Sequence, residues 1–205
     1  SISPLLRMSV MQSEDGAFFY HKGFLPDAMR EALIYDLQVE RFARGGSTIT
    51  MQLVKNVFLN RNKNFARKLE EALIVWLIER LTSKERMYEV YLNIAEWGPL
   101  VYGIQEASAY YFGKRPSQLT TEESIFLASI IPKPKHFRSS FAENGRLKEN
   151  MEGYYKLIAG RLAKKGLISE IEADSIRPDI QVTGDALNSL VGETPESSSP
   201  TAEEQ

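Results

Sequence analysis

The 205-residue sequence contains no cysteine, which excludes disulfide bonds, a thiolate nucleophile and zinc sites built on cysteine. The absence says little about compartment, because the cytosol and an exported domain without disulfides both allow it. Only two histidines are present, His21 and His136. Neither lies in the context of a serine–histidine–aspartate triad or of a metal cluster, so we interpret His21 as a hydrogen-bonded structural residue.

The sequence also lacks a long apolar run and a strong net charge. No stretch approaches the roughly 18 apolar residues of a membrane-spanning helix, and no signal peptide is recognisable. Because the chain begins with serine, we expect it to be an excised domain without its N-terminal segments. Residues 184–205 hold five acids and no base, which leaves 25 basic and 22 acidic residues elsewhere. A charge of about +3 is too weak for bulk nucleic-acid binding.

The remaining composition suits one domain with a substantial core, and helical spacing dominates it. We therefore predict a mainly α protein with a single domain over residues 1–183. Residues 184–205, rich in serine, proline and acids, are predicted to be disordered. The helices are expected after Pro26, after a cap at Ser47 or Thr48, over 65–81, after Ser83, after a Thr120–Glu123 capping box, over 146–165 and over 169–176.

The helix expected over 65–81 is apolar on every face at its centre, residues 72–78. This pattern predicts a buried helix in the middle of the domain. Glu71 lies at the edge of that apolar segment, so its carboxylate is expected to be paired or functional. Arg67, four residues earlier, shares its face.

The stretch 13–23 sets two carboxylates, Glu14 and Asp15, against three aromatic residues. Apolar surroundings raise the pKa of a carboxylate and suit it to acid or base chemistry. On its own, the stretch is more typical of a polar turn over a core. Glu14 would need partners elsewhere in the chain to act as a base.

Residues 55–86 supply basic partners, with eight bases against four acids. They form either solvated helix faces or an anion site, in which Lys55, Arg67 and Lys68 flank a basic loop and could grip a diphosphate. The nearby sequence Gly45-Gly46-Ser47-Thr48 is neither a Walker A loop nor a nucleophile elbow, so capping is its favoured role. Paired carboxylates such as Glu14 and Glu71 are typical of glycosyl chemistry, and a diphosphate grip favours transfer over hydrolysis.

In these motifs the sequence resembles the family 51 glycosyltransferases, which polymerise lipid II into peptidoglycan. The resemblance covers roughly residues 3–165 and is closest to the monofunctional branch. No S-x-x-K or K-T-G transpeptidase motif follows. The motifs that carry it are Glu14-Asp15-x-x-Phe18-x-x-His21-x-Gly23, Gly45 through Asn56, Arg67-Lys68-x-x-Glu71, Lys84 through Tyr91-Leu92-Asn93, and Leu127-Ala128 through Pro132-x-Pro134.

The resemblance implies a lysozyme-like helical fold with a smaller membrane-facing lobe at about residues 24–44. It also implies a membrane anchor outside this chain and a catalytic domain on the outer, periplasmic face of the bacterial cell membrane. The implied partners are lipid II, a polyprenyl-diphosphate-linked glycan, the membrane surface and other cell wall synthesis proteins, with no nucleic acid.

The resemblance further implies an inverting transfer in which Glu14 is the general base. The leaving diphosphate would be stabilised by the side chains of Lys55, Arg67 and Lys68, and Mg²⁺ or Mn²⁺ could also bind there. Glu71 would position these basic side chains or support a bound metal. Two residues, Met51 and Leu25, depart from the family pattern. The other residues implied for the substrate site are Asp15, Phe18, His21, Ser47, Thr48, Gln52 and Asn56.

Three other functions remain open from the sequence. A lysozyme-like hydrolase or lytic transglycosylase would share the fold class and the glutamate. A non-catalytic lipid II-binding relative is motivated only by Met51. A helical nucleic-acid binder would use the basic residues of 55–86 and would show a strong salt dependence.

Overall fold

The computed structural model describes residues 2–25, 47–58, 65–148 and 150–191, and it confirms the predicted mainly helical class. The membrane-facing lobe expected at about 24–44, the helix after Pro26 and the Gly45-Gly46 break fall almost wholly outside these ranges. The elements are α1 (Pro4–Glu14), α3 (Ile49–Phe58), α4 (Phe65–Leu81), α5 (Lys84–Ile94), β1 (Glu96–Gly98), β2 (Val101–Tyr102), α6 (Ile104–Phe112), η1 (Pro116–Gln118), α7 (Thr121–Ile130), η2 (Pro134–Ser140), α8 (Glu152–Lys164), α9 (Glu170–Ser175) and α10 (Asp185–Val191).

Several helices begin where a side chain satisfies their first backbone N–H groups. The Thr48 hydroxyl accepts from the Met51 N–H at 3.1 Å and starts α3. Ser83 accepts from Arg86 N–H at 3.2 Å and starts α5. Capping boxes start α7 at Thr120 and α9 at Ser169. These starts agree with the sequence prediction because capping is a local interaction.

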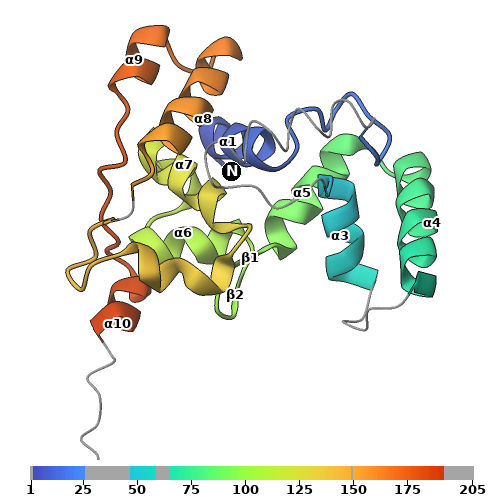
Figure 1. The fold of residues 1–205 in the computed structure, drawn as a ribbon, viewed down its shortest axis with the longest axis horizontal. Coiled ribbons are helices and arrows are strands. Elements are labelled where there is room, and N and C mark those ends of the chain that lie inside the picture. Colours follow the sequence, from blue (N-terminus) through green and yellow to red (C-terminus); the bar gives the residue numbers. More distant parts are fainter. Residues whose placement is uncertain (1, 26–46, 59–64, 149, 192–205) are drawn as a thin grey trace, which may run out of the picture.

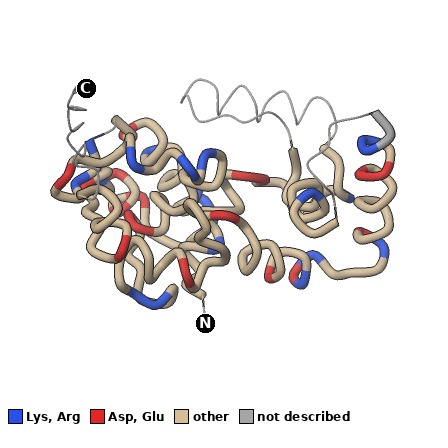
Figure 2. The backbone as a smooth tube through the Cα atoms, turned by 90° about the horizontal axis from the view of Figure 1, so that it is seen from below, with Lys and Arg blue, Asp and Glu red and all other residues tan. Residues whose placement is uncertain are grey.

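Helix α1 lies at the centre of the described structure and packs on α7 and α8 (Figure 1). Its residues Leu6 and Val10 are fully buried. Helices α3 and α4 lie at one end, α6 to α10 gather at the other, and α5 runs between them (Figure 1). Basic and acidic residues are interspersed along both ends of the described chain (Figure 2). Glu14 is the last residue of α1.

The short antiparallel hairpin β1–β2 connects α5 to α6, with Glu96 paired to Tyr102. Tyr111 of α6 donates its hydroxyl to the Trp97 carbonyl at 2.7 Å, and a Cβ on Gly98 would lie 2.9 Å from that hydroxyl oxygen. The hairpin is therefore fixed against the aromatic core, in which Tyr111, Phe126 and Phe137 pack edge to face. This arrangement anchors the C-terminal end of α5.

The prediction that α4 is a buried central helix is wrong. Leu69, Leu73 and Leu81 are 62%, 58% and 81% exposed, and Trp76 is 46% exposed. The helix packs on α3 through one face, where Val75 is fully buried. The sequence of α4 shows that its outer face is apolar. It does not show whether other residues of the chain pack against that face.

Two further boundaries differ from the prediction. The helix expected from residue 146 begins at Glu152, because Arg146 and Leu147 form bridges to Gln181 and Phe141. Part of the tail expected to be disordered forms α10, which packs on α6. The remainder of that tail, 192–205, lies outside the described residues.

The C-terminal segment is held by specific contacts. The Tyr111 carbonyl accepts from the backbone N–H groups of Thr183 and Gly184, and a Cβ on Gly184 would lie 2.4 Å from the carbonyl oxygens of Ala109 and Tyr110. Ala186 is fully buried. The absence of a side chain at Gly184 therefore lets the backbone approach α6 closely, and α10 packs on α6 directly after it. Among the described residues, no helix has the length and apolar character needed to span a bilayer.

Candidate active site

The two predicted carboxylates, Glu14 and Glu71, each contact a side chain of α3. Glu14 is half-buried, and its Oε2 accepts from Gln52 Nε2 at 2.9 Å. Glu71 of α4 is 5% exposed, and its Oε1 lies 3.5 Å from Lys55 Nζ. Glu71 was expected to be paired or functional, and the structure shows it paired with Lys55. Gln52 and Lys55 are three residues apart, so they share one face of α3.

Ser47 connects these two contacts. Its main-chain oxygen accepts from Gln52 Nε2 at 3.5 Å, and its hydroxyl oxygen accepts from Lys55 Nζ at 3.1 Å. A continuous chain of polar contacts thus runs from Glu14 through the start of α3 to Glu71. The two carboxylates and the ammonium group belong to one site built on α1, α3 and α4.

Asp15 lies beneath this site and is fully buried. Its carboxylate oxygens lie 2.9 and 2.8 Å from His21 Nε2, and one of them accepts from the Ile49 N–H at 3.1 Å. His21 Nδ1 accepts from the Gly23 N–H at 3.1 Å, so the ring proton is on Nε2 and is donated to Asp15. An anion at the first residue of α3 is favoured by the helix dipole. Asp15 therefore fastens the 15–23 loop to α3.

Thr48 and Phe18 support the same loop from inside. The Thr48 hydroxyl donates to the Gly23 carbonyl at 2.6 Å. Gly23 has φ +85°, and a Cβ there would lie 2.4 Å from Val75 Cγ1. Phe18 is fully buried against Tyr88, with ring centroids 5.8 Å apart.

The predicted substrate-site residues thus divide into two groups. Asp15, Phe18 and Thr48 are fully buried and His21 is 7% exposed, so in this structure they hold the site without facing a substrate. The residues nearer the surface are Ser47, Gln52, Lys55 and Arg67, which are half-buried, and Asn56 and Lys68, which are exposed.

Two functional candidates escaped the sequence reasoning, Tyr91 and Glu79. Tyr91 of α5 is fully buried and donates its hydroxyl to Gln52 Oε1 at 2.9 Å. Burial raises the pKa of this hydroxyl well above its usual value, and the neighbouring Glu14 raises it further. The hydroxyl therefore stays protonated. The only sequence signal was the Tyr91-Leu92-Asn93 motif, to which no role was attached.

Glu79 of α4 joins three helices. Its Oε1 accepts from the Thr50 hydroxyl of α3 at 2.5 Å and from Lys84 Nζ of α5 at 2.7 Å. The same ammonium group lies 4.3 Å from the centroid of the Phe18 ring. Glu79 lies two helical turns after Glu71, which places both carboxylates on the inner side of α4.

A metal site was tested against the side chains present. The described ranges contain no group of three or more acidic or histidine side chains that could hold a metal ion. Glu71, the residue proposed to support one, is engaged by Lys55. These residues do not fit a resident metal site.

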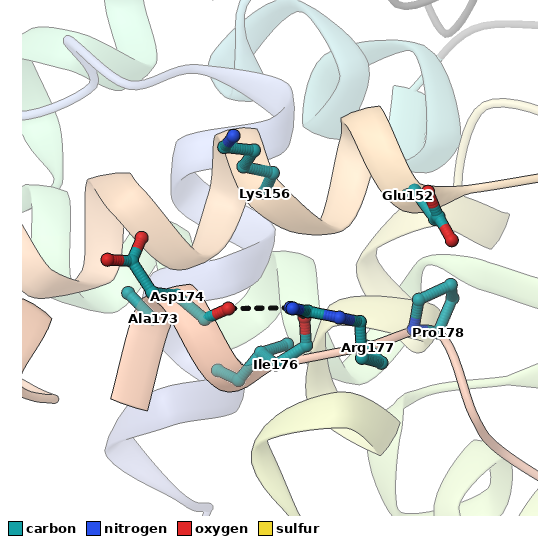
Figure 3. Close-up of a pocket in the computed structure, with 7 residues that line it drawn as sticks. All are labelled: Glu152, Lys156, Ala173, Asp174, Ile176, Arg177 and Pro178. Carbon is teal, nitrogen blue, oxygen red and sulfur yellow. Dashed lines mark hydrogen bonds between the residues drawn. The ribbon is translucent and has the colours of Figure 1, made fainter. Parts of the chain in front are cut away.

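A separate pocket of about 390 Å³ lies between α8 and the turn after α9 (Figure 3). It is lined by charges of both signs, and its Arg177 donates to the Asp174 carbonyl at 2.6 Å. None of the residues predicted for the active site lines it. The lining residues are Glu152, Lys156, Ala173, Asp174, Ile176, Arg177 and Pro178.

Comparison with known proteins identifies the family of this chain. The family model described as Transglycosylase matches residues 1–161. A biosynthetic peptidoglycan transglycosylase of Paraburkholderia xenovorans (strain LB400) is 43% identical over 136 residues, which are 66% of this chain and 57% of the relative. The protein of that name from Nitrosospira multiformis is 37% identical over 166 residues, 81% of this chain and 70% of the relative.

A third protein of that name, from Acinetobacter baumannii (strain ATCC 17978), is 39% identical over 137 residues, 67% of this chain and 61% of the relative. The chain thus matches less than two thirds of the length of some of these relatives. The range matched by the family model, residues 1–161, includes the whole Glu14–Gln52–Lys55–Glu71 site. With its family match over residues 1–161, this chain belongs to the transglycosylase family.

Proposed function

We propose that this chain is a peptidoglycan glycosyltransferase that polymerises lipid II by inverting transfer. The donor is a growing glycan joined through diphosphate to a polyprenol, and the acceptor is the GlcNAc 4-hydroxyl of lipid II. The observation that carries the proposal is the continuous contact chain from Glu14 through Gln52, Ser47 and Lys55 to Glu71. It combines a proton acceptor with a cation for a leaving anion. The names of the relatives supply the peptidoglycan substrate class.

In the proposed reaction, Glu14 takes the proton of the acceptor hydroxyl as general base. The hydroxyl oxygen attacks the anomeric carbon of the donor, a β-1,4 bond forms, and the bond to the diphosphate breaks. Gln52 holds the Glu14 carboxylate through its amide N–H. The reaction requires that Glu14 be ionised before the attack, and a hydrogen-bond donor favours that form.

The leaving diphosphate gains negative charge as its bond breaks, so a fixed cation lowers the barrier. Lys55 is the best-placed candidate, because Glu71 and Ser47 hold its ammonium group while its side chain remains 36% exposed. Arg67 and Lys68, from the first turns of α4, extend the positive charge toward the surface. Asn56, the next residue after Lys55, is exposed on the same helix.

The membrane-facing surface is proposed to include the outer face of α4. Its exposed apolar residues are Leu69, Leu73 and Trp76, and at the end of α3 Val57 and Phe58 are also 48% and 56% exposed. The Arg80 guanidinium lies 4.0 Å from the centroid of the Trp76 ring. An apolar face with an aromatic residue and a cation suits the interface of a bilayer. This placement fits action at the periplasmic face of the membrane.

The proposal is tested by incubating the purified chain with labelled lipid II in detergent and separating the products by length. Glycan chains that lengthen with time support the proposal, and Glu14→Gln is expected to make them at least about 10²-fold more slowly. Cleavage of polymeric glycan without polymerisation would instead support the hydrolase. Tight lipid II binding without product in the unaltered chain would support the non-catalytic relative.

A further inference from the structure

We propose that Tyr91 is a positioning residue for Glu14 and acts through the Gln52 amide. This inference rests on the proposed role of Glu14 as general base. The Tyr91 hydroxyl donates to Gln52 Oε1 at 2.9 Å, and Gln52 Nε2 donates to Glu14 Oε2 at 2.9 Å. The three side chains come from α5, α3 and α1, so the contact chain joins three helices.

The Gln52 amide has one productive orientation in this chain. Its nitrogen faces two acceptors, the Glu14 carboxylate at 2.9 Å and the Ser47 carbonyl at 3.5 Å, and its oxygen faces the Tyr91 hydroxyl. A rotated amide would place its oxygen against both acceptors and lose the donation to Glu14. The buried hydroxyl of Tyr91 fixes the orientation, because it holds a proton to donate.

Without the Tyr91 hydroxyl, the amide oxygen loses its donor, and only the contacts of the amide nitrogen still hold the Gln52 side chain. The donation to Glu14 weakens, and the ionised carboxylate is stabilised less. Because the base must be ionised, the rate at acidic pH should fall first. Alignment of the carboxylate with the acceptor hydroxyl is lost at the same time.

The other groups near Glu14 have partners away from the Gln52 amide. Tyr88 donates its hydroxyl to the Arg7 carbonyl, and Tyr154 donates to the Ser13 hydroxyl at 2.9 Å. Arg161 donates to the Gln12 carbonyl at 2.6 Å. Among the described residues, other ionisable groups near this site include Arg7, Asp15 with His21, and Lys55 with Glu71.

Tyr88 provides a matched control. It lies one turn before Tyr91 on α5, is also buried, and stacks on the Tyr91 ring with centroids 6.3 Å apart. Its hydroxyl bonds to a main-chain carbonyl and not to Gln52. Tyr88→Phe therefore removes the same chemical group from the same helix and leaves the Gln52 contact chain unchanged.

The experiment compares Tyr91→Phe, Tyr88→Phe and the unaltered chain in lipid II polymerisation between pH 5 and 9, with thermal unfolding of each. We expect Tyr91→Phe to lower kcat roughly tenfold, as for the loss of one hydrogen bond, with KM little changed. The acidic limb of kcat/KM should move to higher pH in Tyr91→Phe alone. Identical pH profiles for the two variants and the unaltered chain would overturn the inference.

A second variant keeps the test valid if Tyr91→Phe does not fold. Gln52→Ala removes the middle of the contact chain and should shift the acidic limb in the same direction, and adding Tyr91→Phe should then shift it no further. An unshifted limb in Gln52→Ala would reject the inference. Full activity of Glu14→Gln would reject the proposed function and this inference together. Lost activity in Glu14→Gln with unshifted Tyr91 and Gln52 variants would reject only the role of Tyr91.

Discussion

Lys55 of α3 and Glu71 of α4 form an ion pair, with Nζ and Oε1 3.5 Å apart. Glu71 is buried and Lys55 is partly exposed, so the pair presents a fixed ammonium group at the surface while its counter-ion stays inside. The pair also ties the two helices that make up one end of the molecule. We therefore propose that Glu71 is a positioning residue, a role distinct from the proposed base role of Glu14.

Glu71→Gln should therefore lower the polymerisation rate by about 10²-fold, because Lys55 is no longer held in place. Rates are measured with labelled lipid II, and folding is checked by thermal unfolding. Glu70→Gln is the matched control, since Glu70 is exposed on the same helix and should leave the rate unchanged. Equal rates for the two variants would contradict the positioning role.

Replacing the proposed base has a different signature. Glu14→Gln keeps the size of the side chain but removes the proton acceptor, so kcat should fall by about 10²–10⁴ while lipid II binding persists. Binding is measured separately with a fluorescent lipid II. Glu152→Gln, at an exposed position on α8, serves as the control for loss of one negative charge. A normal rate in Glu14→Gln would refute the assignment.

The Asp15–His21 contact should act on stability first. Asp15→Asn weakens two buried interactions at once, the N–H of His21 Nε2 shared by both carboxylate oxygens and the Ile49 N–H, and should cost about 2–4 kcal/mol of unfolding free energy. Chemical denaturation measures the change. Asp174→Asn, at an exposed position on α9, should change stability by less than about 0.5 kcal/mol. Unchanged stability in Asp15→Asn would show that this network does not hold the loop.

The outer face of α4 should govern binding to lipid vesicles. The double variant Leu69→Glu with Leu73→Glu places two charges on that face and should lower vesicle binding at least tenfold. Co-sedimentation with phosphatidylglycerol vesicles is the measurement. Ile171→Glu is the control, since Ile171 is 83% exposed on α9 at the other end of the molecule. Equal losses in both variants would argue against a membrane surface on α4.

Several helix starts could be predicted from sequence because capping depends on nearby residues, whereas the partner of Glu71, Lys55, lies on another helix. Helix caps are formed by Thr48, Ser83 and Thr120. Each hydroxyl accepts a hydrogen bond from the backbone N–H three residues later. Gln52 and Lys55 share a face through helical spacing alone. Local pattern also identified Glu14 as a carboxylate that needed a partner.

The partner itself was decided by tertiary structure. Glu14 and Gln52 are 38 residues apart in sequence, and Gln52 and Tyr91 are 39 apart, so no local rule connects them. For the same reason, sequence could not show that Phe18 lies under the site or that the outer face of α4 is uncovered. Spacing and capping are properties of short segments, whereas burial depends on which distant segment packs against each face.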